Sequence, residues 1–186
     1  EGFAASSPLT GQNGWTNYGS GGNGLTDWNE QLGYGQSAHI GYEPATPDHL
    51  VLWKPINHNP TNRPIVSVTF DMSVIDSINT NRDEFRWSVY NMAGVRLFSL
   101  LFDNRDLAIY HQLEDEAFRF NGWGFNNDDI YHVEIRMNFA ANLWNVFVGG
   151  TQVITNEPIT TTNASLTFGD ADAVWLRGDV SGAGDN

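Results

Sequence analysis

Apolar and polar residues alternate with a period of two along "IVSVTFDMSVI", residues 65 to 75. Successive side chains of a β-strand point to opposite faces, so this alternation is typical of a strand with one face in a core and the other in solvent. One face of the stretch collects Val66, Val68, Phe70, Met72 and Val74. The stretch therefore predicts a half-buried strand of a sheet.

The same pattern returns along the rest of the chain. In "EFRWSVYNM", residues 84 to 92, an apolar face holds Phe85, Trp87 and Val89. Further strands are predicted at 95–103, 107–114, 131–139, 143–150, 151–155, 164–168 and 173–177, with a hairpin turn at 140–142. No window carries a capped 3.6-residue apolar stripe, so helix should be limited to a turn or two. Many short strands without helices between them predict an all-β sandwich or barrel.

The 186 residues suffice for one domain with a sizeable core, and no linker divides the chain. We expect a single domain over 1–186. Residues 1–63 form a loop-rich segment in which five prolines between positions 44 and 64 interrupt long ladders. The main strands occupy 64–177, and 178–186 approaches a closing strand.

The charge and cysteine content exclude several functions. Nine basic residues stand against 22 acidic ones, a net charge of −13, so nucleic acid is not an expected partner. There are no cysteines, which excludes disulfides, thiolate metal sites and cysteine nucleophiles, and weakly favours a bacterial source. No apolar run is long enough to insert into a membrane. An acidic chain of this kind suits an extracellular or cell-surface location.

Three stretches resemble the concanavalin A-like lectin/glucanase group, and within it the laminin-G-like bacterial exported modules. They are "LTGQNGW" near the start, the hairpin "YHVEIRMNFAANLWNVFVGGTQV" from residue 131, and "DAVWLRGDVSGAGDN" from residue 172. The resemblance implies a two-sheet antiparallel jelly roll. In that group the last strand pairs beside the first, whereas this sequence stops at Asn186, where that strand would begin. An open sheet edge is a template for pairing, so self-association becomes an expectation.

Catalysis is not the favoured interpretation. Related glucanases carry a Glu-x-Asp-x-x-Glu pattern that this chain lacks, and "LEDEAF" (113–118) only places Glu114 and Glu116 on one face if it is extended. A polysaccharide lyase would need a base such as Tyr110 or His111 beside an arginine, but alternation sets these two residues on opposite faces. A hydrolase or lyase therefore ranks third.

A structural calcium ion is a possible cofactor. The five histidines form no zinc-type pair, but oxygen ligands gather near the end of the chain. The stretch "FGDADAVW" offers Asp170 and Asp172 as ligands. Related sandwiches hold calcium where the chain ends meet, so the resemblance adds Glu1 and Asp185. Ordinary Asp/Gly turns would explain the same residues.

Glycan binding needs exposed rings for stacking and polar side chains for hydroxyl groups. The set that faces away from the core contains Arg86, Ser88, Tyr90, Tyr110, Gln112, His132, Glu134 and Arg136. This mixture of aromatic and polar residues suits a glycan, although a solvated sheet face would have a similar composition. Of these, we take Arg86, Tyr90, Tyr110, Gln112, His132 and Arg136 as candidate ligand contacts.

The stretch "GQNGWTNYGSGGNGLTDWN", residues 11 to 29, is too rich in glycine and asparagine for a helix and favours a strand poorly, yet it contains three aromatic rings. We expect Trp15 to pack against the sandwich, and Tyr18 and Trp28 to contact a ligand or a neighbouring subunit. Core positions are predicted for Trp87, Trp144 and Trp175, and exposed ones for Trp53 and Trp123.

Two functional hypotheses follow. In the first, the chain is a non-catalytic extracellular glycan-binding module, with lectin-like use of exposed rings. In the second, it is a structural or adhesive surface subunit whose incomplete sheet edge joins copies of the chain into a filament or layer.

Overall fold

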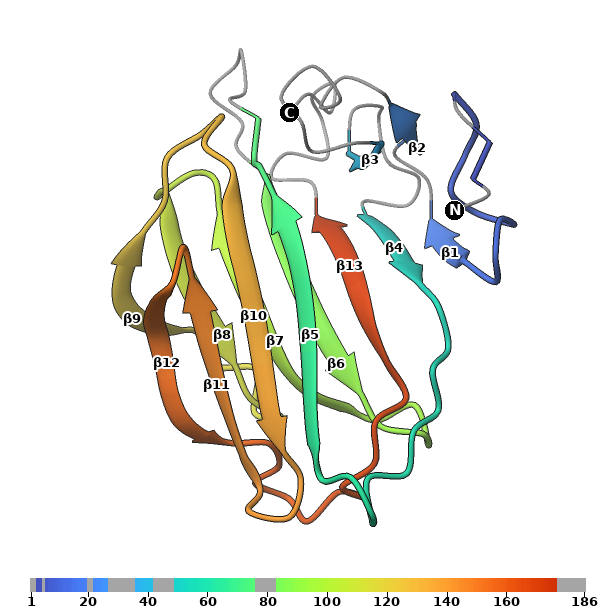
Figure 1. Ribbon diagram of the computed structural model, residues 1–186. Helices are drawn as coiled ribbons and strands as arrows, with labels where there is room; N and C mark the ends of the chain where they lie inside the picture. Colours follow the sequence, from blue (N-terminus) through green and yellow to red (C-terminus); the bar gives the residue numbers. More distant parts are fainter. Residues whose placement is uncertain are drawn as a thin grey trace.

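The computed structural model describes residues 3–4, 6–19, 22–26, 36–41, 49–75 and 83–176. In these ranges the chain forms two stacked antiparallel sheets and a small hairpin (Figure 1). The predicted all-β, two-sheet antiparallel sandwich is confirmed. No helix occurs in these ranges, and hence none that is long and apolar enough to cross a membrane.

The larger sheet has seven strands. In spatial order they are β1 (Thr16–Gly19), β4 (His49–Trp53), β13 (Asp170–Leu176), β6 (Glu84–Tyr90), β7 (Arg96–Asp103), β8 (Ala108–Gln112) and β9 (Arg119–Gly124). The four-stranded sheet packs against it in the order β12 (Thr151–Pro158), β11 (Leu143–Val148), β10 (Tyr131–Asn138) and β5 (Ile65–Met72). A separate hairpin joins β2 (Asn23–Thr26) to β3 (Ser37–Ile40).

The main core lies between the two sheets, and aromatic stacking joins them. Trp144 of β11 stacks on Phe98 of β7 with 3.9 Å between ring centroids, and both are fully buried. Trp87 of β6 stacks in the same way on Phe70 of β5, also at 3.9 Å. Rings of this size dominate core energetics because each buries a large apolar area. The core positions predicted for Trp87 and Trp144 are confirmed.

A second, smaller core lies under β4 and β13. Trp175 is fully buried there beside Leu50 and Leu52, with Trp15 packed against the cluster at partial exposure. The Trp175 ring nitrogen donates a hydrogen bond of 2.8 Å to Asp83. Gly41 passes so close that a Cβ would lie 2.8 Å from the ring, at a positive φ of 86°. The predictions for Trp15 and Trp175 are therefore confirmed.

Some predicted elements are absent or displaced. The predicted strand 164–168 is wrong, because this segment contributes only an isolated bridge between Phe168 and His58. The segment 113–118 is not extended, because Glu116 donates its N–H to the Leu113 carbonyl and closes a turn, so the condition for a shared strand face of Glu114 and Glu116 is not met. Strand β9 was not predicted, because its sequence RFNGWG has two glycines and no alternation. The segment 178–186, which contains Asp185, lies outside the described residues, as do Glu1 and Trp28.

The acidic turn after β8 is tied to the connection that follows β12. Glu114 accepts hydrogen bonds from the Thr160, Thr161 and Thr162 hydroxyls at 2.6 to 2.8 Å. It also accepts the backbone N–H groups of Thr161 and Thr162. Burial alone would raise the pKa of this carboxyl, but the hydrogen bonds outweigh it and lower the pKa to about 2. Glu114 is thus a structural group rather than a solvated or catalytic one.

We expect Glu114→Gln to destabilise the fold by about 2 kcal/mol at pH 7, since charge-assisted hydrogen bonds are lost. In a chain of this length that corresponds to a melting temperature roughly 4–8 °C lower. The lowered pKa means that the wild-type advantage is full above the unfolded pKa near pH 4.3 and is lost as the pH falls toward 2. Thermal unfolding of the wild type and of Glu114→Gln at several pH values measures this difference in stability.

The matched control is Glu116→Gln, whose carboxylate is mostly exposed and pairs only with Arg96 at 3.3 Å. An exposed ion pair contributes little, so this variant should melt close to the wild type. Equal melting temperatures for both variants would contradict the structural role of Glu114.

Candidate functional site

The outward face of the seven-stranded sheet carries a polar row across four adjacent strands. Strand register places Asp172 of β13 beside Ser88 of β6, Ser88 beside Ser99 of β7, and Ser99 beside Gln112 of β8. All four residues face away from the main core, yet each is buried. We call Asp172, Ser88, Ser99 and Gln112 the outward row.

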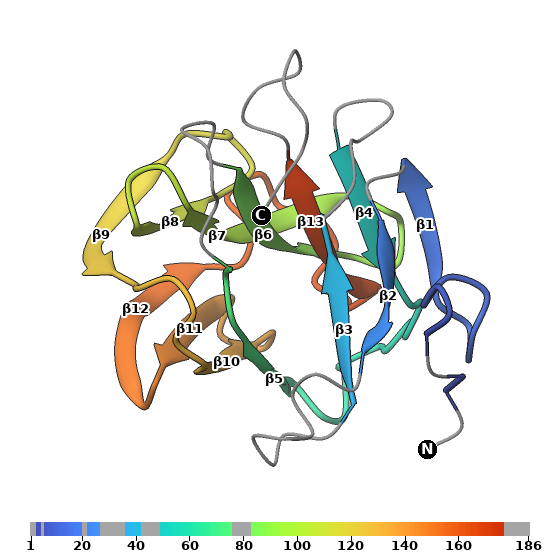
Figure 2. The same cartoon turned by 90° about the horizontal axis from the view of Figure 1, so that it is seen from above.

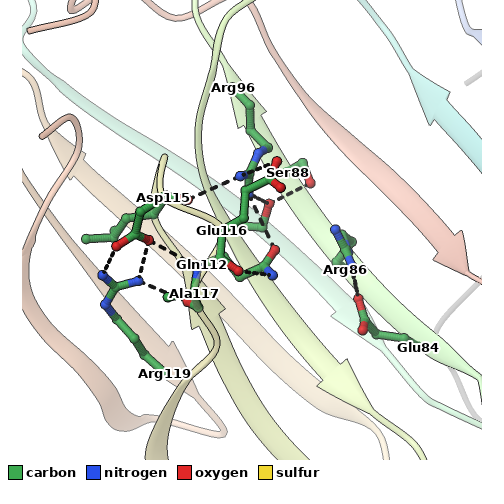
Figure 3. Close-up of polar contacts among 11 residues, drawn as sticks. Glu84, Arg86, Ser88, Arg96, Gln112, Asp115, Glu116, Ala117 and Arg119 are labelled. Atoms are coloured by element: carbon green, nitrogen blue, oxygen red, sulfur yellow. Dashed lines mark hydrogen bonds and ion pairs between the residues drawn. The ribbon is translucent and has the colours of Figure 1, made fainter. Parts of the chain in front are cut away.

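Arg96 at the start of β7 organises one end of the outward row (Figure 3). Its guanidinium donates to Ser99 Oγ at 3.2 Å and to Gln112 Oε1 at 3.5 Å. It also reaches the Leu113 carbonyl at 3.2 Å and the Glu116 carboxylate at 3.3 Å. A planar guanidinium with several partners is held in place, so this side chain is preorganised.

The remaining polar atoms of the row are also bonded. The Ser88 and Ser99 hydroxyls lie 2.8 Å apart, and the Gln112 amide donates to the Glu116 carbonyl at 2.9 Å. Farther along the sheet, Arg86 pairs with Glu84 of the same strand (Figure 3). Both arginines of this face therefore already carry a carboxylate partner.

Exposed aromatic rings stand beside the Gln112 end of the row. Tyr110 precedes Gln112 by two residues on the same face of β8, and Phe120 of β9 lies opposite Tyr110. The Tyr110 ring centroid is 5.4 Å from that of Phe120 and 6.0 Å from that of Phe118. Phe118 is 55% and Phe120 60% exposed, unusual values for phenylalanine. We call Tyr110, Phe118 and Phe120 the ring cluster.

Two neighbouring carboxyl groups stand at the other end of the row. Asp170 and Asp172 share the outward face of β13, two residues apart, where the charge of Asp170 acts on Asp172. Asp172 is only 7% exposed, and its Oδ1 has no hydrogen-bond partner among the described residues. Burial first and the Asp170 charge second raise the pKa of Asp172 to about 8. Burial also raises the pKa of Tyr90, which lies opposite Asp170.

The structure divides the predicted ligand contacts between two opposite surfaces. Arg86, Tyr90, Tyr110 and Gln112 share the outward face of the seven-stranded sheet. His132 and Arg136 lie on the outward face of the four-stranded sheet, so the prediction of one continuous face is wrong. Alternation separates inward from outward positions, but it does not say to which of the two sheets a strand belongs.

The two misplaced residues have local partners on their own sheet. His132 Nδ1 lies 2.8 Å from Asp71 on the adjacent strand. Arg136 forms an ion pair with Glu134 at 2.9 Å, and its guanidinium lies 5.3 Å from the Phe147 ring centroid. These contacts account for both side chains without a ligand.

Tyr18 is exposed as expected, at 59%, and its ring lies 5.4 Å from that of His49. It shares the outward face with Tyr110 but belongs to β1, five strands away from β8. At about 4.8 Å per strand the two residues are roughly 24 Å apart. Tyr18 therefore does not belong to the ring cluster.

His111 follows Tyr110 but faces the main core, as alternation predicted. It is buried edge-on against Trp144, with 5.8 Å between ring centroids, and neither ring nitrogen has a hydrogen-bond partner among the described residues. Burial lowers its pKa, although Glu157 at 3.9 Å opposes that shift. The pair Tyr110 and His111 cannot act on one substrate from the same side of the sheet.

Of the four predicted calcium ligands, only Asp170 and Asp172 fall within the described ranges. In those ranges no group of three or more His, Cys, Asp or Glu side chains is placed to hold a metal ion. Two adjacent carboxyls do not supply the six to eight oxygen ligands that calcium takes.

The sequence did not point to Arg96, Phe118 or Phe120. Alternation from the inward Phe98 would place Arg96 inward as well, but the pairing of β6 with β7 shifts register after Val89, which turns Arg96 outward. Phe118 and Phe120 flank Arg119 with a spacing of two. That spacing was a signal for a shared face, but the glycines after them masked the strand.

No protein family model and no curated protein matches the sequence. Among solved structures, one described as a sialidase superposes with a TM-score of 0.59 and 13% identity, covering 93% of this chain. The chain spans only 14% of that protein's length. The potassium-bound carbohydrate recognition domain of Emp46p superposes with a TM-score of 0.56 and 8% identity, covering 90% of this chain and 82% of that domain. These similarities show a concanavalin A-like β sandwich, which confirms that part of the resemblance.

The raised pKa of Asp172 leads to a test by pH. The folded chain holds this proton up to about pH 8, whereas an unfolded Asp loses it near pH 4, so the group costs stability increasingly as the pH rises between these values. We expect the melting temperature of Asp172→Asn, relative to that of the wild type, to increase across this pH window. At pH 8 the variant should melt about 3 °C or more above the wild type.

Asp106→Asn, which changes an exposed carboxyl on the β7–β8 turn, serves as the control. The difference in melting temperature between Asp172→Asn and the wild type should shrink toward pH 4. A difference that stays constant from pH 4 to pH 8 would show that Asp172 is ionised in the folded chain throughout.

Proposed function

We propose that this chain is a non-catalytic, extracellular glycan-binding module whose ligand lies on the outward face of the seven-stranded sheet. The observation that carries the proposal is the exposed ring cluster standing beside the hydrogen-bonded outward row. Exposed rings offer flat apolar surfaces for the C–H faces of a sugar, and the exposed Glu116 carboxylate at this end of the row can accept hydrogen bonds from its hydroxyls. The lectin-type similarity of the fold supports the same interpretation.

The charges of the site favour a neutral glycan. Arg86 and Arg96 are already paired with Glu84 and Glu116, so neither is available to neutralise an acidic sugar. The chain as a whole carries a net charge of −13, which repels anionic polymers at low salt. We therefore expect unsubstituted hexose or N-acetylhexosamine chains to bind better than uronic or sialic acids.

Three carboxyl groups, Asp170, Asp172 and Glu114, are arranged in a way that supports a binding rather than a hydrolytic role. Glycosidases hold two carboxyl groups about 5 Å or more apart, across the bond to be cleaved. Asp170 and Asp172 lie two residues apart on the same face of β13, and Glu114 is engaged by three threonines. Neither arrangement leaves an acid and a base on opposite sides of a sugar linkage.

Other parts of the proposal rest on the sequence. The extracellular location, the bacterial source and the laminin-G-like grouping follow from the acidic, cysteine-free composition and from the three resembling stretches. A structural calcium ion held by Asp170 and Asp172 together with Glu1 and Asp185, which lie outside the described residues, also stays a proposal, to be tested by binding with and without EDTA.

A glycan array followed by calorimetry tests the ring cluster. We expect Phe120→Ala to weaken the binding of the best neutral oligosaccharide roughly tenfold, because a lost ring contact of about 1.4 kcal/mol gives that factor. Phe120 is largely exposed, so the melting temperature should fall by no more than about 3 °C.

His132→Ala is the matched control, since it changes an exposed ring on the opposite sheet. Its affinity should equal that of the wild type. Equal losses for the two variants, or no glycan bound by the wild type at millimolar concentration, would refute this site.

A further inference from the structure

The two lateral sides of the sandwich differ. On one side β12 lies next to β9, so the edges of the two sheets cover each other (Figure 2). His111 of β8 and Glu157 of β12 approach to 3.9 Å on this side. On the other side, the outer edge of β5 pairs with no strand among the described residues.

The backbone bonding of β10 shows which groups of β5 point outward. The Phe139 N–H donates to the Pro64 carbonyl, whereas the Gly149 N–H donates to the His132 carbonyl. Bonded positions alternate along an antiparallel strand, so Val66, Val68 and Phe70 use their backbone groups toward β10. The residues whose N–H and C=O groups point away from the sheet are Ile65, Ser67, Thr69 and Asp71.

Open space accompanies this edge. A shallow, open groove runs along β5 between its residues 65–69 and the segment 56–58. Its apolar lining includes Ile56, Val66, Val68 and Phe168. Edge strands are commonly protected by lysine or proline, but residues 65–70 contain neither, nor any charged side chain. Ile65 is even 62% exposed.

The charges at the two ends of the strand are complementary in an antiparallel arrangement. Arg63 and Asp71 are both exposed and lie four residues before and after Ser67. Arg63 forms no ion pair with a described residue, and among the described residues the Asp71 carboxylate has one recorded polar partner, the exposed His132. In an antiparallel pair of two β5 strands centred on Ser67, each Arg63 lies opposite Asp71 of the other copy. Ile65 then lies opposite Thr69, and the backbone N–H and C=O groups of both residues point away from β10.

We propose that β5 is a self-association edge, at which two copies of this chain pair antiparallel about Ser67 and join their four-stranded sheets into one of eight strands. The partner is a second copy of this chain because the register matches the strand with itself. Each Arg63 meets an Asp71, the outward-pointing backbone groups of the two strands meet, and paired side chains lie on the same face of the joined sheet. Val66 and Val68 of one copy then lie beside the same residues of the other copy, so that the apolar linings of the two β5 strands are continuous. The proposal concerns a different surface from the ring cluster and does not depend on glycan binding.

A charge-swap experiment tests this pairing in the purified chain. Sedimentation over an about hundredfold concentration range should show a concentration-dependent dimer for the wild type. Arg63→Glu places two like charges at each contact, and Asp71→Arg does the same with opposite sign. Each variant alone should weaken dimerisation at least about tenfold.

Mixing the two variants restores both ion pairs. The carboxylate introduced by Arg63→Glu in one copy then meets the guanidinium introduced by Asp71→Arg in the other, while the native Arg63 and Asp71 meet at the second contact. The mixture should form a heterodimer close to wild-type strength. Arg105→Glu, an equal charge change at the distant β7–β8 turn, should dimerise like the wild type.

Three results would overturn the proposal. They are a wild type that stays monomeric over the whole range, single variants that dimerise like the wild type, and a mixture that shows no rescue. None of these outcomes bears on the glycan site, which is measured by calorimetry with Phe120→Ala.

Discussion

The stacking of Trp144 on Phe98 is the contact on which the arrangement of both sheets depends. It joins a central strand of the four-stranded sheet to a central strand of the seven-stranded sheet, and both rings are fully buried. Because side chains alternate along a strand, fixing Phe98 inward sends Ser99 outward. The polar outward face of β6, β7 and β8 is thus a direct consequence of the way the core is packed.

The sequence predicted much of this architecture from alternation alone. The inward sets of 65–75 and 84–92, the 131–150 hairpin and the buried positions of Trp144 and Trp175 all have strong apolar periodicity, and all are found as predicted. The failures have physical causes. Glycines masked the strand pattern of β9, and a register shift turned Arg96 outward. The acidic segment after β8 forms a turn in which Glu114 is bonded by distant threonine hydroxyls.

The candidate site was harder to predict than the fold. Arg86, Tyr90, Tyr110 and Gln112 do lie on one outward face, because alternation suffices to identify an outward residue. His132 and Arg136 were assigned to the wrong surface, because the division of strands between two sheets is set by long-range pairing rather than by local pattern. The ring cluster emerges only when β8 and β9 pair, which brings Phe120 beside Tyr110.

The two proposed surfaces are compatible and reinforce each other. Pairing through β5 extends the four-stranded sheet and leaves the outward face of the seven-stranded sheet uncovered. Two copies related by a two-fold axis perpendicular to the joined sheet would display their ring clusters in the same direction. A repeating glycan could then be bound at two points, and its apparent affinity would exceed that of one site.

A crystal structure with the best-binding neutral oligosaccharide tests the central claim most directly. The account predicts a sugar ring against Tyr110 or Phe120, with hydroxyl groups bonded near Gln112 and Arg96. An ordered sugar on the face of the four-stranded sheet, beside Glu134 and Arg136, would contradict it.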